Sequence, residues 1–153
     1  MQNRNAGEQE FIEWLNCNDL PFIYVEQSLE TYSRHFQNKI KRPDFHIVIH
    51  GLGVIAVDVK CQPFKKDIYK TFTLGQDEYD RLQSYSQNFN IPVWIVYASR
   101  PKNIDAWHWL NIRHFEEVAE LRENSKDHTS FYVIDVKACK TLGITDQLGK
   151  ILL

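Results

Sequence analysis

Two strand-like segments joined by a glycine-rich turn constrain the fold of this chain most strongly. The segments are FHIVIH at 45–50 and VIAVDVK at 54–60, and Gly51-Leu52-Gly53 separates them. Short apolar runs rich in β-branched residues are typical of strands, and a short loop with two glycines is typical of a hairpin. We therefore expect an antiparallel β-hairpin in which His50 lies opposite Val54.

Weaker patterns add helices and further strands around this hairpin. Glu8, Phe11, Ile12 and Leu15 are spaced so that they share one face of a helix over 6–17. Further strands are predicted at 22–26, 93–98 and 131–137, and further helices at 77–89 and 105–123. This order predicts the α/β class, with a central mixed β-sheet flanked by helices.

Length and composition predict one ordinary globular domain over residues 1–153. The 153 residues are 43% hydrophobic and 25% charged, and neither a low-complexity linker nor a break in composition divides them. Three cysteines without close spacing, and an N-terminus without a leader-like apolar core, predict reduced thiols and a cytoplasmic location. No run approaches the roughly 20 apolar residues that a membrane helix needs, so we expect no membrane span.

The charge balance restricts how the chain can meet nucleic acid. A net charge of −2 argues against a broad basic surface that coats duplex DNA regardless of sequence. The local basic runs are Lys39-Ile40-Lys41-Arg42 and, second, Lys65-Lys66 with Lys70. Each run is either a phosphate-binding patch or an ordinary solvated surface. The sequence also lacks the phosphate-binding loop of nucleotide-dependent motors.

The second strand of the hairpin carries the residues that indicate chemistry. Because side chains alternate along a strand, Asp58 and Lys60 share one face, and the opposite face is wholly apolar. The predicted register places Asp44 opposite Lys60 and near Asp58, with His46 facing Asp58. Charges at this depth are costly unless they are paired or bound to a metal.

Two carboxylates beside a lysine suit metal-assisted hydrolysis of a phosphodiester. Mg²⁺ takes oxygen ligands and is usually held by one or two carboxylates together with water and phosphate. A neighbouring lysine can hold the attacking water or stabilise the charge of the transition state. The alternative is a plain surface pair of aspartate and lysine. Asp135-Val136-Lys137 repeats the tripeptide without a Pro-Asp at a comparable distance upstream, so we interpret that copy as structural.

The combined pattern resembles the PD-(D/E)xK nuclease superfamily, with Pro43-Asp44 as the PD and Asp58-Val59-Lys60 as the (D/E)xK. The resemblance covers residues 7 to 98. It implies a restriction-endonuclease-like core, Mg²⁺ or Mn²⁺ as the cofactor, and DNA as the substrate. It also implies that Asp44, Asp58 and the backbone carbonyl of Val59 are metal ligands, and that Lys60 is the catalytic lysine.

The first predicted helix resembles the start of archaeal Holliday junction resolvases and their relatives. In that family a glutamate precedes a pair of inward-facing apolar residues, and Glu8 matches it better than Glu10 does. The resemblance implies that Glu8 completes the metal site. Gln62, two residues beyond Lys60 on the same face, is expected either to touch substrate or a water on the metal, or to be an ordinary polar strand end. Gln9 stands where the family often has a basic residue, which favours a nuclease in general over a junction resolvase.

Together these features predict a metal-dependent endo- or exonuclease that hydrolyses DNA phosphodiester bonds. The residues expected to carry catalysis are Asp44, Asp58, Lys60, Glu8 and Gln62. DNA is the expected partner, and a homodimer or a larger nucleic-acid-processing partner would supply the targeting that the low basic charge does not. Two alternatives stay open. One is a non-catalytic nucleic-acid- or protein-binding module on the same fold, and the other is a structural or toxin-neutralising protein in which the motif is accidental.

Overall fold

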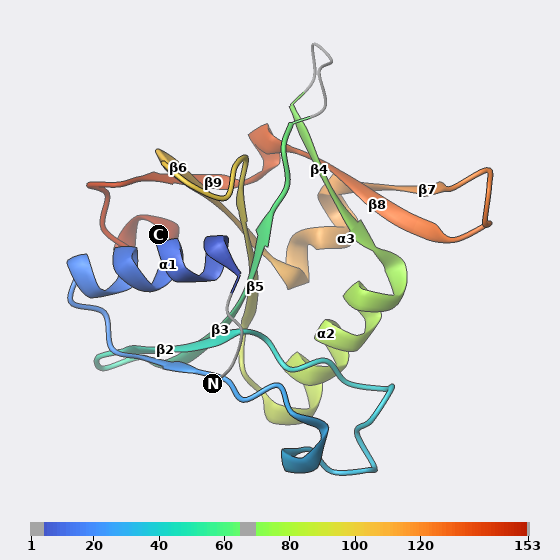
Figure 1. Ribbon diagram of the computed structural model, residues 1–153, viewed down its shortest axis with the longest axis horizontal. Coiled ribbons are helices and arrows are strands. Elements are labelled where there is room, and N and C mark those ends of the chain that lie inside the picture. Colours follow the sequence, from blue (N-terminus) through green and yellow to red (C-terminus); the bar gives the residue numbers. More distant parts are fainter. Residues whose placement is uncertain (1–4, 65–69, 153) are drawn as a thin grey trace.

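A six-stranded mixed β-sheet forms the centre of the protein, in a computed structural model that describes residues 5–64 and 70–152 (Figure 1). β3 and β5 are parallel, and the other neighbours in this sheet are antiparallel. In spatial order the strands are β1 (Phe22–Tyr24), β2 (Phe45–Ile49), β3 (Gly53–Cys61), β5 (Val93–Ala98), β6 (Ala106–Asn111) and β9 (Lys140–Gly143).

Helices and a smaller sheet cover the two faces of the central sheet. α1 (Ala6–Cys17) and α4 (Gly149–Leu152) pack on one face, where Phe11 and Ile151 join the inward side chains of β2 and β3. α2 (Gln76–Phe89) and α3 (Phe115–Val118) pack on the other face. The predicted α/β class, a mixed sheet flanked by helices, is confirmed. No helix among the described residues is both long and apolar enough to cross a membrane.

The smaller sheet has three strands and stands beside α2 (Figure 1). Its order is β4 (Thr71–Gly75), β8 (Ser130–Asp135) and β7 (Ala119–Glu123), all antiparallel. Phe72 of β4 and Ile134 of β8 are fully buried in the core beneath α2. Sequence analysis did not predict β4, although its buried and half-buried residues alternate, which is typical of a strand.

The predicted helix over 105–123 is wrong. This segment forms β6, a 3-10 turn at Ile112–His114, the single-turn α3, and then β7. Trp107 and Trp109 of β6 are buried toward α1, whereas Leu110 is buried toward α2. Both faces of β6 therefore carry apolar side chains, so the segment lacks the clean alternation that separates a strand from a helix. The predicted strand at 131–137 ends at Asp135, where a 3-10 turn at Val136–Ala138 follows.

The β2–β3 hairpin forms, but its pairing differs from the prediction. Ile49 pairs with Gly53, so the three-residue loop is His50-Gly51-Leu52. The Leu52 N–H donates a hydrogen bond of 3.0 Å to the Ile49 carbonyl within this turn. Gly51 has a φ of 80° and Gly53 a φ of 121°, conformations that glycine adopts at little cost. The change moves every partner by two residues. Because the strand repeat is two, each side chain keeps its predicted face but meets a different partner.

Candidate functional site

Asp58 is fully buried in β3, on the face of the central sheet that α2 covers. Its neighbours Val57 and Val59 lie in the apolar core beneath α1, which confirms the predicted alternation along this strand. Among the described residues, only Glu8 and Asp58 are charged and buried. A carboxylate at this depth requires compensating charge or hydrogen bonds.

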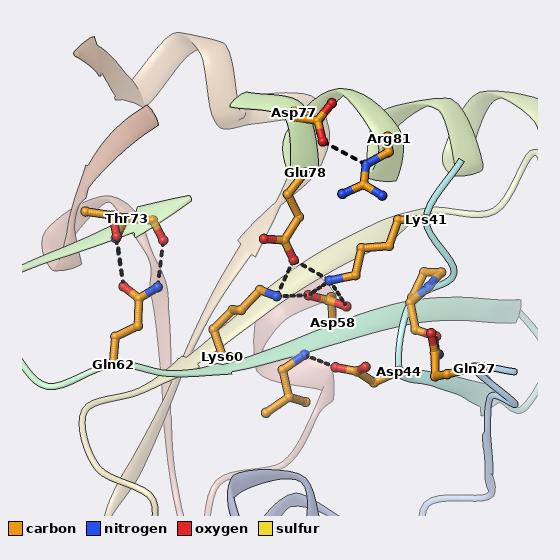
Figure 2. Close-up of polar contacts among 12 residues, drawn as sticks. Gln27, Lys41, Asp44, Asp58, Lys60, Gln62, Thr73, Asp77, Glu78 and Arg81 are labelled. Carbon is orange, nitrogen blue, oxygen red and sulfur yellow. Dashed lines mark hydrogen bonds and ion pairs between the residues drawn. The ribbon is translucent and has the colours of Figure 1, made fainter. Parts of the chain in front are cut away.

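Two lysines and a glutamate surround the Asp58 carboxylate (Figure 2). Lys60 Nζ lies 2.9 Å from Asp58 Oδ2, and Lys41 Nζ lies 3.4 Å from both Asp58 oxygens. Glu78, in the first turn of α2, accepts hydrogen bonds from both ammonium groups through Oε1. Two positive and two negative side chains therefore balance. We call Lys41, Asp58, Lys60 and Glu78 the four-charge cluster.

Burial and charge oppose each other on the ionisable groups of this cluster. Burial lowers the pKa of the Lys60 ammonium, but the carboxylates of Asp58 and Glu78 outweigh burial and raise that pKa above its usual range. Burial raises the pKa of Glu78, but Lys60 and Lys41 outweigh burial and bring that pKa below 4.5. Lys60 is therefore protonated and Glu78 ionised near neutral pH.

Asp44 lies one residue before β2 begins, beside the middle of β3. Its Oδ2 accepts a hydrogen bond of 2.8 Å from the backbone N–H of Val59 (Figure 2). Continued by one step, the β2–β3 register places Asp44 opposite Asp58, and not opposite Lys60 as predicted. Burial, and then the nearby Asp58 carboxylate, raise the pKa of Asp44 to about 8. Two carboxylates opposite each other on neighbouring strands repel, so this arrangement favours either a protonated Asp44 or a bound cation.

Glu8 is buried in the first turn of α1, so its predicted inward orientation is confirmed. It forms a capping box with Asn5: the Asn5 N–H donates to Glu8 Oε2 at 2.9 Å, and the Glu8 N–H donates to Asn5 Oδ1 at 2.8 Å. The Tyr24 hydroxyl donates to Glu8 Oε1 at 3.4 Å. The charge of Glu8 also contributes to the raised pKa of Asp44, so the two carboxylates are electrostatic neighbours.

Gln62 fixes the end of β3 against β4. Its Nε2 donates to the Thr73 carbonyl at 2.9 Å, and its Oε1 accepts from the Thr73 N–H at 2.9 Å (Figure 2). The side-chain amide is therefore used by the backbone of the neighbouring sheet. A contact between Gln62 and substrate stays a prediction.

The basic run at 39–42 does not form a patch as a unit. Lys39 is exposed, whereas Lys41 points into the four-charge cluster. Arg42 donates a hydrogen bond to the Ser28 carbonyl at 2.8 Å. Lys65-Lys66, the second basic run, lie outside the described residues.

Two further residues from the sequence analysis take no part in the four-charge cluster. His46 lies opposite Ala56, not Asp58, and its Nε2 is 2.6 Å from the Tyr85 hydroxyl. In the second DVK tripeptide, Asp135 ends β8, and its side chain accepts a hydrogen bond of 2.9 Å from the Lys137 N–H. Asp135 is thus the cap of a 3-10 turn, in agreement with a structural role.

The carboxylates of Asp44 and Asp58 offer oxygen donors of the kind that a divalent cation takes. Asp58 Oδ1 is buried and makes no hydrogen bond. The two carboxylates provide the hard oxygen atoms that Mg²⁺ needs when water and phosphate complete its shell. No three His, Cys, Asp or Glu side chains of residues 5–64 and 70–152 are grouped so that they could hold a metal ion. A cation would therefore need oxygen atoms from backbone, water or substrate, and space beside Lys41 and Lys60.

Sequence analysis missed Lys41 and Glu78 as parts of this site. Lys41 carried one signal, because it precedes the Pro-Asp by two residues, but its basic neighbours indicated a solvated surface. Glu78 carried none, since an acidic residue in the first turn of a helix is explained by the helix dipole alone. Only the packing of α2 over β3 brings the two residues together.

Comparisons with known proteins give one clear result. No protein-family model and no curated protein matches the chain by sequence. Among solved structures, Hjc, a Holliday junction resolvase from the archaeal hyperthermophile Archaeoglobus fulgidus, matches with a TM-score of 0.55 and 17% identity. The match covers 86% of this chain and 88% of that chain. At this identity the likeness shows the fold alone, and the protein therefore has the mixed α/β fold of this resolvase.

Proposed function

We propose that the protein is a metal-dependent nuclease of the PD-(D/E)xK type that hydrolyses DNA phosphodiester bonds. One observation carries the proposal: the buried Asp58 carboxylate, with its Oδ1 free of hydrogen bonds, lies beside Asp44 and Lys60. A purely structural ion pair needs no second carboxylate at this point. Like charges at this range are unfavourable unless a proton or a cation relieves them. The resolvase-like fold supports the proposal.

In this proposal the metal ligands come from the hairpin and from α1. Asp44, Asp58 and the carbonyl of Val59 would hold Mg²⁺ or Mn²⁺, and Glu8 would complete the site through a bound water. The bound cation would supply charge neutralisation at the phosphate and a more acidic water. Glu8 already lies close enough to raise the pKa of Asp44, which supports its inclusion.

Lys60 would act on the nucleophile and on the phosphate. Its ammonium is held protonated by Asp58 and Glu78, so it can donate hydrogen bonds but cannot act as a base. It would orient the attacking water or stabilise negative charge on the phosphate in the transition state. Gln62 would act indirectly, because its contacts with Thr73 fix the end of the strand that carries Lys60.

DNA is the proposed substrate because the structural neighbour is a Holliday junction resolvase. We also propose that residues 1–153 form a single nuclease-like domain. The net charge of −2 provides little general attraction to DNA, so a homodimer or a larger nucleic-acid-processing partner would assist targeting. A second candidate function is a non-catalytic binding module on the same fold. The observation that favours it is the neutral four-charge cluster, in which lysines already balance both carboxylates.

The test is a cleavage assay on branched, nicked and single-stranded DNA, and on RNA, with Mn²⁺, Mg²⁺ or a chelator. We expect cleavage of DNA with either metal and none with the chelator. Lys60→Met should lower the rate roughly a hundredfold, because it removes a donor to the transition state. Absence of cleavage on every substrate with both metals would contradict the proposal. Retained DNA binding without any cleavage would favour the binding module.

A further inference from the structure

Lys41 occupies a specific position beside the buried carboxylate. Its Nζ lies 3.4 Å from Asp58 Oδ1, the oxygen that makes no hydrogen bond, and 3.4 Å from Oδ2. Lys60, in contrast, bonds Oδ2 at 2.9 Å. The Lys41 ammonium is therefore the positive charge that faces the otherwise unpartnered side of Asp58, among the residues that the structure describes.

Lys41 is also held from two other directions. Its backbone N–H donates to the Arg81 carbonyl of α2 at 3.2 Å, so the start of its side chain is fixed against that helix. Its ammonium donates to Glu78, which lies one helical turn before Arg81. With its backbone held at Arg81, the Lys41 side chain reaches two acidic partners, Asp58 and Glu78. If Asp58 bound another cation, Glu78 would still be a partner for the Lys41 ammonium.

We propose that Lys41 is a built-in counter-cation of Asp58 that a divalent metal must displace, and that Glu78 retains the displaced ammonium. This inference rests on the proposed function, because it concerns the same metal site. An ammonium and a divalent cation cannot both lie against Asp58 Oδ1 without strong repulsion. The apparent metal affinity therefore contains the free energy of moving Lys41 away from Asp58.

The same arrangement explains how Asp58 stays compatible with folding in the absence of metal. A fully buried carboxylate without a partner is strongly destabilising, and Lys41 with Lys60 supplies compensating charge. Metal binding then exchanges one cation for another. We expect the metal to raise the unfolding temperature of the wild-type protein less than that of a variant without the Lys41 charge.

The experiment measures Mn²⁺ binding to the full chain by isothermal titration calorimetry, without DNA. Lys41→Met should bind Mn²⁺ roughly tenfold more tightly than wild type, because the competing cation is gone. Lys39→Met is the matched control, because it removes the same charge from the same loop. Lys39 lies two residues from Lys41 and is exposed. It should leave the Mn²⁺ affinity unchanged. If Lys41→Met does not fold, Lys41→Gln gives the same comparison.

A double-variant cycle tests the part assigned to Glu78. Glu78→Gln should weaken Mn²⁺ binding in the wild-type background, because Lys41 then has only Asp58 as a partner. It should have little effect in the Lys41→Met background, whereas loss of a direct metal ligand would weaken binding in both backgrounds. Equal weakening in both would overturn the role given to Glu78.

The outcomes separate this inference from the proposed function. Equal Mn²⁺ affinity of wild type and Lys41→Met would overturn the inference and leave the metal site standing. Absence of Mn²⁺ binding in every variant, with DNA cleavage also absent, would overturn both. Tighter binding by Lys41→Met together with an unchanged Lys39→Met supports the inference.

Discussion

At the scale of single residues, burial of charge is the property that marks this site. Asp58 and Glu8 are the charged residues buried in the described part of the chain, and each is compensated differently. Asp58 is compensated by two lysines, and Glu8 by the backbone N–H of Asn5 and the Tyr24 hydroxyl. The alternation along β3 was sufficient to predict that Asp58 and Lys60 share a face. It was not sufficient to predict Lys41 and Glu78, because their contacts depend on packing between distant segments.

Glu8 is expected to separate a structural role from a functional one. Glu8→Gln keeps an oxygen acceptor for the Asn5 N–H, so the free energy of unfolding should change by less than about 1 kcal/mol. It removes the negative charge, so metal affinity and DNA cleavage should fall roughly tenfold or more. Chemical denaturation and cleavage rates measure the two effects. Glu13→Gln, on the exposed face of the same helix, is the control. An unchanged cleavage rate in Glu8→Gln would exclude Glu8 from the site.

His108 is expected to make stability depend on pH. Burial, chiefly, lowers the pKa of His108 from 6.5, and its Nδ1 lies 2.9 Å from the Thr141 hydroxyl. The folded protein therefore prefers the neutral imidazole. The stability from this preference is fully present above pH 6.5 and is lost as the pH falls through the lower pKa of the folded state. Denaturant titrations at several pH values in this range should show that the free energy of unfolding changes less with pH in His108→Gln than in wild type. His50 lies in the exposed hairpin turn. If His50→Gln reduced the pH dependence of the free energy of unfolding as much as His108→Gln does, this assignment would be contradicted.

At the scale of elements, the fold was predictable where one pattern prevailed. The helix at 6–17 and the strand at 93–98 were predicted with their observed bounds, because the first has a clear amphipathic face and the second is apolar throughout. The hairpin was predicted with the correct faces but a register displaced by two residues, since both glycines allowed the turn to close one position earlier. The segment at 105–123 was not predicted correctly, because Leu110 on one face of β6 and Trp107 and Trp109 on the other are all apolar and buried.

The contact between α1 and β3 gives a prediction at this scale. A Cβ on Gly7 would lie 2.0 Å from Cys61 Sγ and 3.3 Å from Cys61 Cβ, so Gly7→Ala must turn the Cys61 side chain away or move the start of α1 away from β3. We expect a loss of roughly 1–3 kcal/mol in the free energy of unfolding. Because Glu8 follows directly, cleavage should fall as well.

Two variants control for the intrinsic effect of removing a glycine. Gly149→Ala, in α4, meets no atom within 4 Å and should be neutral or stabilising by up to about 1 kcal/mol. Cys61→Ala should restore most of the stability of Gly7→Ala, because it removes the sulfur atom. A Gly7→Ala protein as stable as wild type in denaturant titrations would show that the approach of α1 to β3 is not tight.

At the scale of the whole molecule, the layers decide which residues can meet. Asp44 lies directly before the start of β2, and Lys41 lies in the loop that leads to it. Glu8 comes from α1 on one face of the sheet, and Glu78 comes from α2 on the other. The mixed α/β fold, shared with an archaeal Holliday junction resolvase, brings Lys41 and Glu78 to Asp58 on the face that α2 covers, whereas Glu8 approaches Asp44 from the α1 side. The sequence allowed the hairpin part of this site to be predicted, because neighbouring strands pair by simple rules. The contribution of α2 required the assembled core.

The central claim is that Asp58, and not its sequence copy, carries metal-dependent DNA cleavage. Asp58 and Asp135 both begin a DVK tripeptide, but only Asp58 lies in the four-charge cluster, whereas Asp135 caps a 3-10 turn. The decisive measurement is the Mn²⁺-dependent cleavage rate of wild type, Asp58→Asn and Asp135→Asn on one DNA substrate. Asp58→Asn should lose roughly a hundredfold or more in rate, and Asp135→Asn should retain the wild-type rate. A folded Asp58→Asn protein that cleaves as fast as wild type, or an equal loss in Asp135→Asn, would contradict the claim.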